Sequence, residues 1–269
     1  MSNISTTIES TTVEDESRSA FRSFFSGILT ALSNVLTIAG RELRAYFFSP
    51  IAYVITAIFT FFTGFLFYNN LLASQQADLS NDFSWMLVLA VFAAPFLTMR
   101  LFAEENRMGT IELLMTAPVR DWEIVIGKYL AGLVAYMFML FPTLWHVVIV
   151  WRYGPPDFGP ILSGYLLMLL VGATFVAIGM FASSLTQNQI VAAVIAFFTL
   201  LFLWVANAPA SATGATNWLT QFLSYIALTT HFSDFQNGVL DSTHILYFLS
   251  VAAIAVFLTV RVVESKRWR

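Results

Sequence analysis

The sequence has no cysteine and few charged residues, and both absences narrow the class of protein. Without cysteine, the chain forms no disulfide bond, thiolate metal site or cysteine nucleophile. Only 11% of the 269 residues are charged, whereas 58% are hydrophobic, and the mean hydropathy is +0.75. A soluble domain of this length would be less apolar, so we expect an integral membrane protein.

Motifs for nucleotide binding and for hydrolysis are also missing. Gly127-Lys128 lacks both the upstream glycine spacing and the following hydroxyl residue of a phosphate-binding loop. No G-x-S-x-G, H-E-x-x-H or dinucleotide-binding glycine pattern occurs. We therefore expect a chain that is not an enzyme, with no catalytic residue, no cofactor and no metal site of its own.

Six apolar stretches are long enough to cross a membrane as helices, which requires about 20 residues each. The alternation of polar and apolar residues that is typical of membrane strands is absent. We therefore predict an all-α membrane protein whose six spans are Ile51–Leu72, Phe83–Ala103, Ile124–Trp151, Ile161–Phe181, Ile190–Ala206 and His244–Val262.

Charge is distributed unevenly with respect to these predicted spans. Their central parts contain no Asp, Glu, Lys or Arg, which argues against a carrier driven by an ion gradient. With the N-terminus in the cytoplasm, only Arg152 of the 13 Lys and Arg residues falls outside. The positive-inside rule thus predicts a multi-pass membrane protein with both termini cytoplasmic.

The chain divides into four predicted regions. Residues 1–17 are polar and acidic and lack the apolar core of a signal peptide, so we expect a disordered cytoplasmic tail. Residues 18–48 have the spacing of an amphipathic helix at the membrane interface, which fits a plain anchor as well as a lever that senses a partner. The six-helix domain then covers 49–263, and a basic cytoplasmic tail covers 264–269.

Two further features concern the membrane domain itself. The apolar stretch 218–228 has about half the length of a span, which predicts a re-entrant or interfacial helix on the outer side between the fifth and sixth spans. Gly172 and Gly179 lie seven residues apart in the fourth span, so they share a helix face and predict close helix packing.

The three histidines are candidate ligands for haem or copper. They are His146 within the third span, and His231 and His244 near the outer surface. No two of them have the i, i+4 spacing of a helical ligand pair, and a single histidine is more often a hydrogen-bonded packing residue.

Charge gathers in one stretch between the second and third spans, residues 101–119, which reads LFAEENRMGTIELLMTAPV. Gly109-Thr110 is expected to end one helix and start a short second one over 111–116, and Pro118 stops it. Asp121 is expected to cap the helix that follows. A short helix with exposed leucines suits a docking element for a soluble partner, and it also suits an ordinary interfacial turn.

This stretch, together with the Asp121, Trp122, Ile124 and Gly127-Lys128 that follow it, resembles the second cytoplasmic loop of ABC-2 type transporter permeases. The likeness is nearest to the permeases linked with gliding motility and with copper-enzyme maturation. IGMFASSLTQNQIVAA (178–193) and HFSDFQNGVLDSTHILYFLS (231–250) resemble further parts of the family, so that the similarity covers residues 35–262.

The resemblance implies the permease subunit of an ATP-driven exporter, in which a coupling helix seats in a separate ATPase chain. Its implied partners are two ATPase subunits, a second permease protomer and the lipid membrane, but no nucleic acid. Lys128 corresponds to a lysine of the family and suits an interface anchor equally well. The implied coupling residues are Glu104, Glu105, Arg107, Gly109, Thr110, Glu112, Leu113 and Leu114, and those at the inner interface are Arg41, Arg44, Arg100 and Lys128.

Two other functions stay open from the residues alone. The chain could be a structural subunit of a larger membrane complex, or a membrane redox protein that uses its histidines. Within the transporter interpretation, the aromatic and uncharged spans suit a lipid-linked or amphipathic cargo, or mechanical work on the cell envelope.

Overall fold

The computed structural model describes residues 27–74, 78–110, 119–209, 217–232, 235, 238 and 241–267. These segments are helical apart from turns and short connections, so the predicted all-α fold is confirmed. A helix over 27–47 comes first. It is followed by α2 (Pro50–Ser74), α3 (Ser80–Thr98), α4 (Arg100–Met108), α6 (Asp121–Leu140), η1 (Phe141–Thr143), α7 (Leu144–Tyr153), α8 (Phe158–Leu185), α9 (Gln189–Val205), α11 (Trp218–Ile226), η2 (Leu228–His231) and α13 (Ser242–Arg267).

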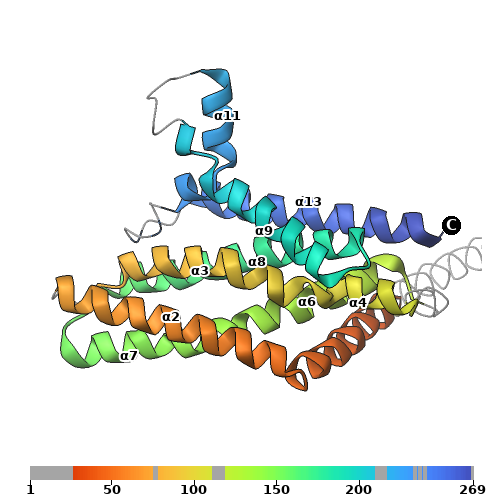
Figure 1. Ribbon diagram of the computed structural model, residues 1–269, viewed down its shortest axis with the longest axis horizontal. Helices are drawn as coiled ribbons and strands as arrows, with labels where there is room; N and C mark the ends of the chain where they lie inside the picture. Colours follow the sequence, from red (N-terminus) through yellow and green to blue (C-terminus); the bar gives the residue numbers. More distant parts are fainter. Residues whose placement is uncertain are drawn as a thin grey trace, which may run out of the picture.

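The long helices lie side by side in one bundle (Figure 1). The helix α8 is its centre, because 72% of its most apolar stretch is buried, against 28% in α2 and in α13. We call the end that holds α4, the start of α6 and the end of α13 the basic end. The opposite end, with the start of α3 and the end of α7, is the distal end (Figure 1).

Within the described residues, five helical stretches are long and apolar enough to cross a membrane. They correspond to the first, second, third, fourth and sixth predicted spans. The fifth, α9, is apolar but has only 17 residues, which is the lower limit of about 17–25 for a spanning helix. The five spans are Pro50–Ala73, Ser80–Met108, Asp121–Tyr153, Phe158–Leu185 and Ser242–Arg267.

The second span is interrupted at Met99, where α3 gives way to α4. The first N–H groups of a new helix have no partner within it. Ser183 of α8 supplies one, because its hydroxyl oxygen lies 3.0 Å from the N–H nitrogen of Phe102 and 2.9 Å from that of Ala103. The same hydroxyl donates to the carbonyl oxygen of Met99 at 2.8 Å. Ser183 thus bonds to backbone groups on both sides of the break and links the second span to the central helix α8.

The third span is also broken, into α6, η1 and α7. Pro142 lies in η1, where it has no N–H to donate and its ring prevents a continuous α-helix. Thr143 satisfies part of the freed backbone, because its hydroxyl donates to the carbonyl oxygen of Leu140 at 2.7 Å.

The predicted close packing through the glycines of α8 is confirmed, but it involves two neighbouring helices. A Cβ atom at Gly172 would lie 2.2 Å from Cε1 of Tyr136 in α6. One at Gly179 would lie 2.0 Å from Oγ1 of Thr98 in α3. The missing side chains therefore let α8 approach both helices.

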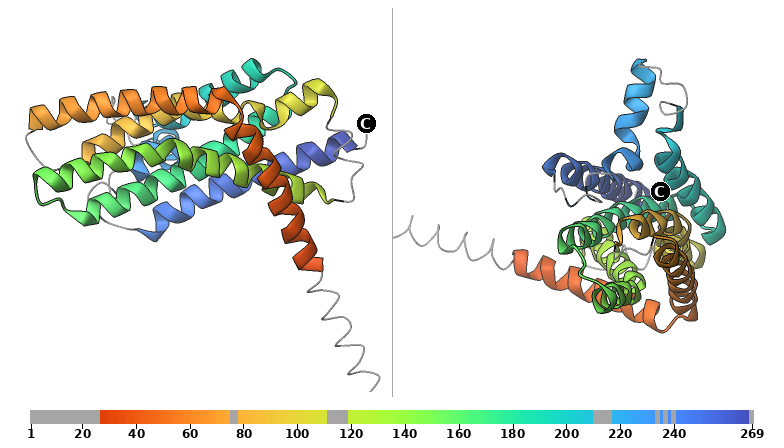
Figure 2. Two further views of the ribbon diagram at one scale, coloured as in Figure 1. Left: turned by 90° about the horizontal axis from the view of Figure 1, so that it is seen from below. Right: turned by 90° about the vertical axis from the view of Figure 1, so that its left-hand side faces the viewer.

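Two helices are not aligned with the long axis of the bundle. The helix over 27–47 crosses the basic end at a steep angle to the bundle (Figure 2). The helix α11 projects sideways at the distal end (Figure 1) and falls within the predicted range 218–228, although its place in a membrane stays a prediction. None of its residues is fully buried, and its exposed apolar side chains include Trp218, Leu219 and Phe222.

Candidate functional site

The helix over 27–47 is fixed to α6 by a close crossing. A Cβ atom at Gly127 would lie 2.8 Å from Cγ2 of Ile38 and 3.0 Å from the carbonyl oxygen of Val35. Next to this contact, the amide of Asn34 donates to Oε2 of the buried Glu123 at 3.0 Å. The predicted amphipathic helix is thus packed on protein and does not rest on lipid alone.

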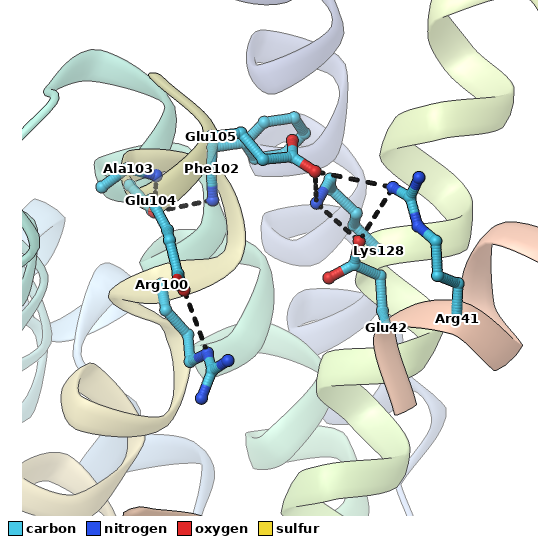
Figure 3. Close-up of polar contacts among 9 residues, drawn as sticks. Arg41, Glu42, Arg100, Phe102, Ala103, Glu104, Glu105 and Lys128 are labelled. Atoms are coloured by element: carbon cyan, nitrogen blue, oxygen red, sulfur yellow. Dashed lines mark hydrogen bonds and ion pairs between the residues drawn. The ribbon is translucent and has the colours of Figure 1, made fainter. Parts of the chain in front are cut away.

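Beside this crossing lies a compact set of charges, Arg41, Glu42, Glu105 and Lys128, which we call the Lys128 cluster (Figure 3). The Nζ atom of Lys128 donates to Oε1 of Glu42 at 3.0 Å and to Oε1 of Glu105 at 2.9 Å. The Nη2 atom of Arg41 lies 3.2 Å and 3.6 Å from the same two oxygens. The cluster thereby joins the helix over 27–47, α4 and α6.

Burial makes this cluster energetically important. The side chain of Lys128 is 1% exposed and its ammonium lies 5.2 Å from the ring centre of Phe102, whereas Arg41 is 58% exposed. Removing one partner of a buried ion pair typically costs about 3–5 kcal/mol, because the other charge is left uncompensated. The second oxygen of Glu105, Oε2, is buried without a hydrogen-bond partner in the described part of the chain. The cluster is therefore balanced in charge but not saturated in hydrogen bonds.

A second set of contacts ties the helix over 27–47 to α3 and α4. Arg100 pairs with Glu104 at 3.4 Å (Figure 3), and its guanidinium lies 5.4 Å from the ring centre of Tyr46. Burial raises the pKa of Tyr46, while the charge of Arg100 acts in the opposite direction. The hydroxyl of Tyr46 therefore stays protonated and donates to the carbonyl oxygen of Leu97 at 2.7 Å.

Between these contacts lies a cavity of about 510 Å³ at the basic end, with several charged residues in its lining. The helix over 27–47 and α4 form its walls, and Lys128 of α6 closes one side. Its charged and aromatic lining includes Arg41, Glu42, Tyr46, Arg100, Glu105 and Lys128.

The helix α4 ends as the sequence predicts. Gly109 has a φ of 69°, in the left-handed region that favours glycine, and the N–H of Thr110 bonds to the carbonyl of Glu105 at 3.1 Å. Arg107 and Met108 are exposed beside this turn. The predicted short helix over 111–116 lies outside the described residues, and so do Glu112, Leu113 and Leu114.

The predicted cap of α6 on Asp121 is wrong. Asp121 is the first residue of the helix, and Arg120 holds the capping position. The carboxylate of Glu123 accepts the backbone N–H of Arg120 at 3.3 Å, as in a capping box. Asp121 instead pairs with Arg267 at 3.3 Å and so links the start of α6 to the end of α13.

The structure thus brings together Glu104, Glu105, Arg41, Arg100 and Lys128 from the predicted set, whereas Arg44 is exposed outside the cluster. Lys128 is buried, and its ammonium contacts Glu42 and Glu105.

Glu42 and Tyr46 were missed by the sequence analysis. With Ile38, they occupy every fourth position and so share one face of the helix. An acid, Glu42, on the apolar face of a basic amphipathic helix was the signal in the sequence that could have identified them.

The histidines lie at other places in the bundle. His146 is buried against Asp82, which the sequence analysis had placed outside the spans. Nδ1 of His231 lies 2.7 Å from Nδ1 of His244. In the described segments, no group of three or more His, Asp or Glu residues is arranged to hold a metal ion.

Comparisons with known proteins agree with the sequence pattern. A family model described as "ABC-2 family transporter protein" matches residues 36–264. The "Probable multidrug ABC transporter permease YbhR" of Escherichia coli K12 is 29% identical over 167 residues, which cover 57% of this chain and 43% of the relative. The protein of the same name from Escherichia coli O157:H7 matches with the same values. The match thus spans less than half the length of these relatives.

Proposed function

Because the chain belongs to the ABC-2 family of transporter proteins, we propose that it is the membrane-spanning permease subunit of an ATP-driven transporter. ATP hydrolysis takes place on a separate ATPase subunit, and this chain carries its effect into the membrane. The observation that supports this role most directly is the Lys128 cluster, which joins α4 to α6 and to the helix over 27–47.

The coupling residues divide into two groups with different tasks. Arg107, Gly109, Thr110, Glu112, Leu113 and Leu114 form the part of the coupling element that faces the ATPase, and Glu104 and Glu105 hold α4 to the rest of the protein. A displacement of α4 is transmitted through Glu105 and Lys128 to α6, and through Glu42 to the helix over 27–47. Coupling requires that the two membrane conformations bind the ATPase states with different affinity.

The arrangement in the membrane follows from the same proposal. The basic end faces the cytoplasm, both termini are cytoplasmic, and α9 completes a set of six spans in a bacterial inner membrane. The helix over 27–47 and α11 lie at the inner and outer interfaces. Two permease protomers and two ATPase subunits form the working assembly. The asymmetry of basic residues between the ends supports this orientation.

The proposed cargo is amphipathic or lipid-linked. An apolar cavity of about 430 Å³ opens between α3 and α9, and every residue that lines it is apolar. The relatives' printed name, a probable multidrug permease, agrees with a cargo that partitions into lipid. The lining includes Phe92, Phe96, Met99, Ile190, Val194 and Phe197.

Co-purification from native membranes in mild detergent tests the proposal. Arg107→Glu/Met108→Asp is the informative variant, because both side chains are exposed and hold no part of the Lys128 cluster. Tyr153→Ser, at an exposed position of the distal end, is the matched control. We expect an ATPase subunit and ATP hydrolysis to accompany wild type and the control, and to be lost from the double variant.

Two results would contradict the proposal. One is that the double variant retains the ATPase at the wild-type level, which would show that the ATPase does not dock at Arg107 and Met108. The other is that wild type brings down a stable set of membrane proteins without any ATPase, which favours a structural subunit of a larger complex.

A further inference from the structure

Asp82 and His146 form a buried acid–base pair at the distal end, far from the Lys128 cluster. Oδ2 of Asp82 lies 2.9 Å from Nδ1 of His146, and the two side chains are 1% and 6% exposed. The pair joins the first turn of α3 to α7. Ionisable side chains at such positions in a membrane bundle are expensive to bury, and they commonly mark pathways for ions or protons.

The surroundings of the pair are apolar on the side of α2. The ring of Phe67 stacks on the imidazole with 4.4 Å between ring centres and 4° between planes. A Cβ atom at Gly64 would lie 3.9 Å from Nε2 of His146, so α2 passes the imidazole closely. The other carboxylate oxygen, Oδ1 of Asp82, is buried without a hydrogen-bond partner among the described residues.

The number of protons on the pair determines its net charge. With no titratable proton it is a buried anion, with two it is a buried cation, and with one it is neutral. Burial in a low-dielectric bundle penalises both charged extremes. The stacked face of Phe67 attracts an imidazolium, and the short contact to Oδ2 suits a carboxylate beside it. The one-proton state avoids both charged extremes, with the proton on either side of the 2.9 Å contact between Oδ2 and Nδ1.

Tyr165 of α8 is the titratable neighbour of Asp82 in the described part of the bundle. It is within electrostatic range of Asp82, but its hydroxyl donates to the carbonyl oxygen of Thr143 at 2.8 Å. The solvent-exposed Asp78 lies four residues before Asp82, ahead of the start of α3. Protons from the distal side therefore have a short route to the pair when the helix ends separate.

We propose that Asp82 and His146 form a proton-binding site, which holds one proton between them and ties α3 to α7 at the distal end. Proton binding takes a proton from water on the distal side and forms one N–H bond on His146 or one O–H bond on Asp82, and no bond in the protein breaks. Parting of α7 from α3 exposes both groups to water, so that opening of the distal end is linked to proton exchange with that side. The site itself does not depend on the proposed transport function.

Nitrogen-15 NMR of histidine-labelled protein in lipid nanodiscs tests the site directly. The signals of His231 and His244 serve as internal references, and His146→Gln identifies the third signal. In wild type at pH 7 we expect one proton on the pair, seen as an imidazolium beside a carboxylate or as a neutral imidazole beside a carboxylic acid. In Asp82→Asn we expect the nitrogen signals of His146 to shift, because the carboxylate that contacts Nδ1 is gone.

Infrared spectra of aspartate-labelled wild-type protein provide a second readout, which needs no variant to fold. A neutral His146 combined with a carboxylic acid band would still place one proton on the pair. A neutral His146 at pH 7 without such a band shows an unprotonated pair and overturns the proposal.

The link to helix packing has its own test in thermal unfolding. We expect Asp82→Asn and His146→Gln each to lower the unfolding temperature by on the order of 10 °C, since each leaves one buried group unpaired. The double variant Asp82→Asn/His146→Gln should recover most of this loss, because two neutral amides can bond to each other. Additive losses in the double variant contradict a coupled pair.

Discussion

At the scale of single residues, Lys128 is the buried charge that links three helices at the basic end. It is buried, and it separates two carboxylates that come from different elements. Neither Glu42 nor Glu105 can turn fully to water, since their side chains are only 15% and 16% exposed.

Lys128→Met should therefore destabilise the protein by about 3 kcal/mol, the lower part of the range for buried pairs, because partial exposure screens the two carboxylates. Thermal unfolding in detergent measures the change. Arg44→Met, at an exposed position of the neighbouring helix, is the control and should change stability by less than about 0.5 kcal/mol. Equal unfolding temperatures for the two variants would show that the cluster contributes nothing.

Gly127 is the second residue whose substitution the geometry decides. In Gly127→Ala the new methyl group meets Ile38 and the backbone oxygen of Val35, so the helix over 27–47 must shift away from α6. We expect a loss of about 1–3 kcal/mol and faster proteolytic cleavage within that helix. Gly40→Ala is the matched control, since a Cβ atom there meets nothing within 4 Å and should stabilise the helix by about 0.5–1 kcal/mol. Equal cleavage rates in both variants would refute the close crossing.

At the scale of elements, the interrupted spans show how one helix completes another. The hydroxyl of Ser183 in α8 takes the place of backbone partners that the break before α4 removes. This contact keeps α4 aligned with α8, and α4 carries Glu105 to Lys128.

Ser183→Ala should leave the N–H of Phe102 buried and unpaired, at a cost of about 1–3 kcal/mol, whereas the N–H of Ala103 keeps the carbonyl of Met99 as its helical partner. Hydrogen–deuterium exchange should then rise at the Phe102 amide before the rest of α4 opens. Ser184→Ala is the comparison, because in the part of the chain that the structure describes its hydroxyl bonds to Phe181 of its own helix, at 2.7 Å, so exchange in α4 should not change. Unaltered exchange at Phe102 in Ser183→Ala would show that the break is stabilised in another way.

At the scale of the whole molecule, the two ends of the bundle differ in charge. This difference is the physical basis for the proposed orientation, and the absence of native cysteine makes it simple to test. Arg107→Cys and Tyr153→Cys place single thiols at opposite ends, both at exposed positions.

A membrane-impermeant maleimide applied to intact spheroplasts should label Tyr153→Cys and leave Arg107→Cys unlabelled until the membrane is permeabilised. The reason is that basic residues are retained on the cytoplasmic side during insertion. The reverse pattern would invert the topology and place the Lys128 cluster away from any cytoplasmic ATPase.

The sequence by itself determined the helical class, five of the spans and the turn at Gly109. Apolar length sets the spans, and the left-handed conformation at Gly109 is a local property of glycine. These features depend on residues close together in the chain, so their signals are present in short stretches of sequence.

Only the tertiary structure decided which charges meet. Glu42 and Lys128 are 86 positions apart, Asp82 and His146 are 64 apart, and Ser183 is 81 positions from Phe102. Each contact depends on where two helices cross. Glycines and proline breaks allow these crossings, but the sequence does not show which helix packs against each of them. A buried charge and an exposed one look alike in the sequence, because burial is a property of the assembled bundle.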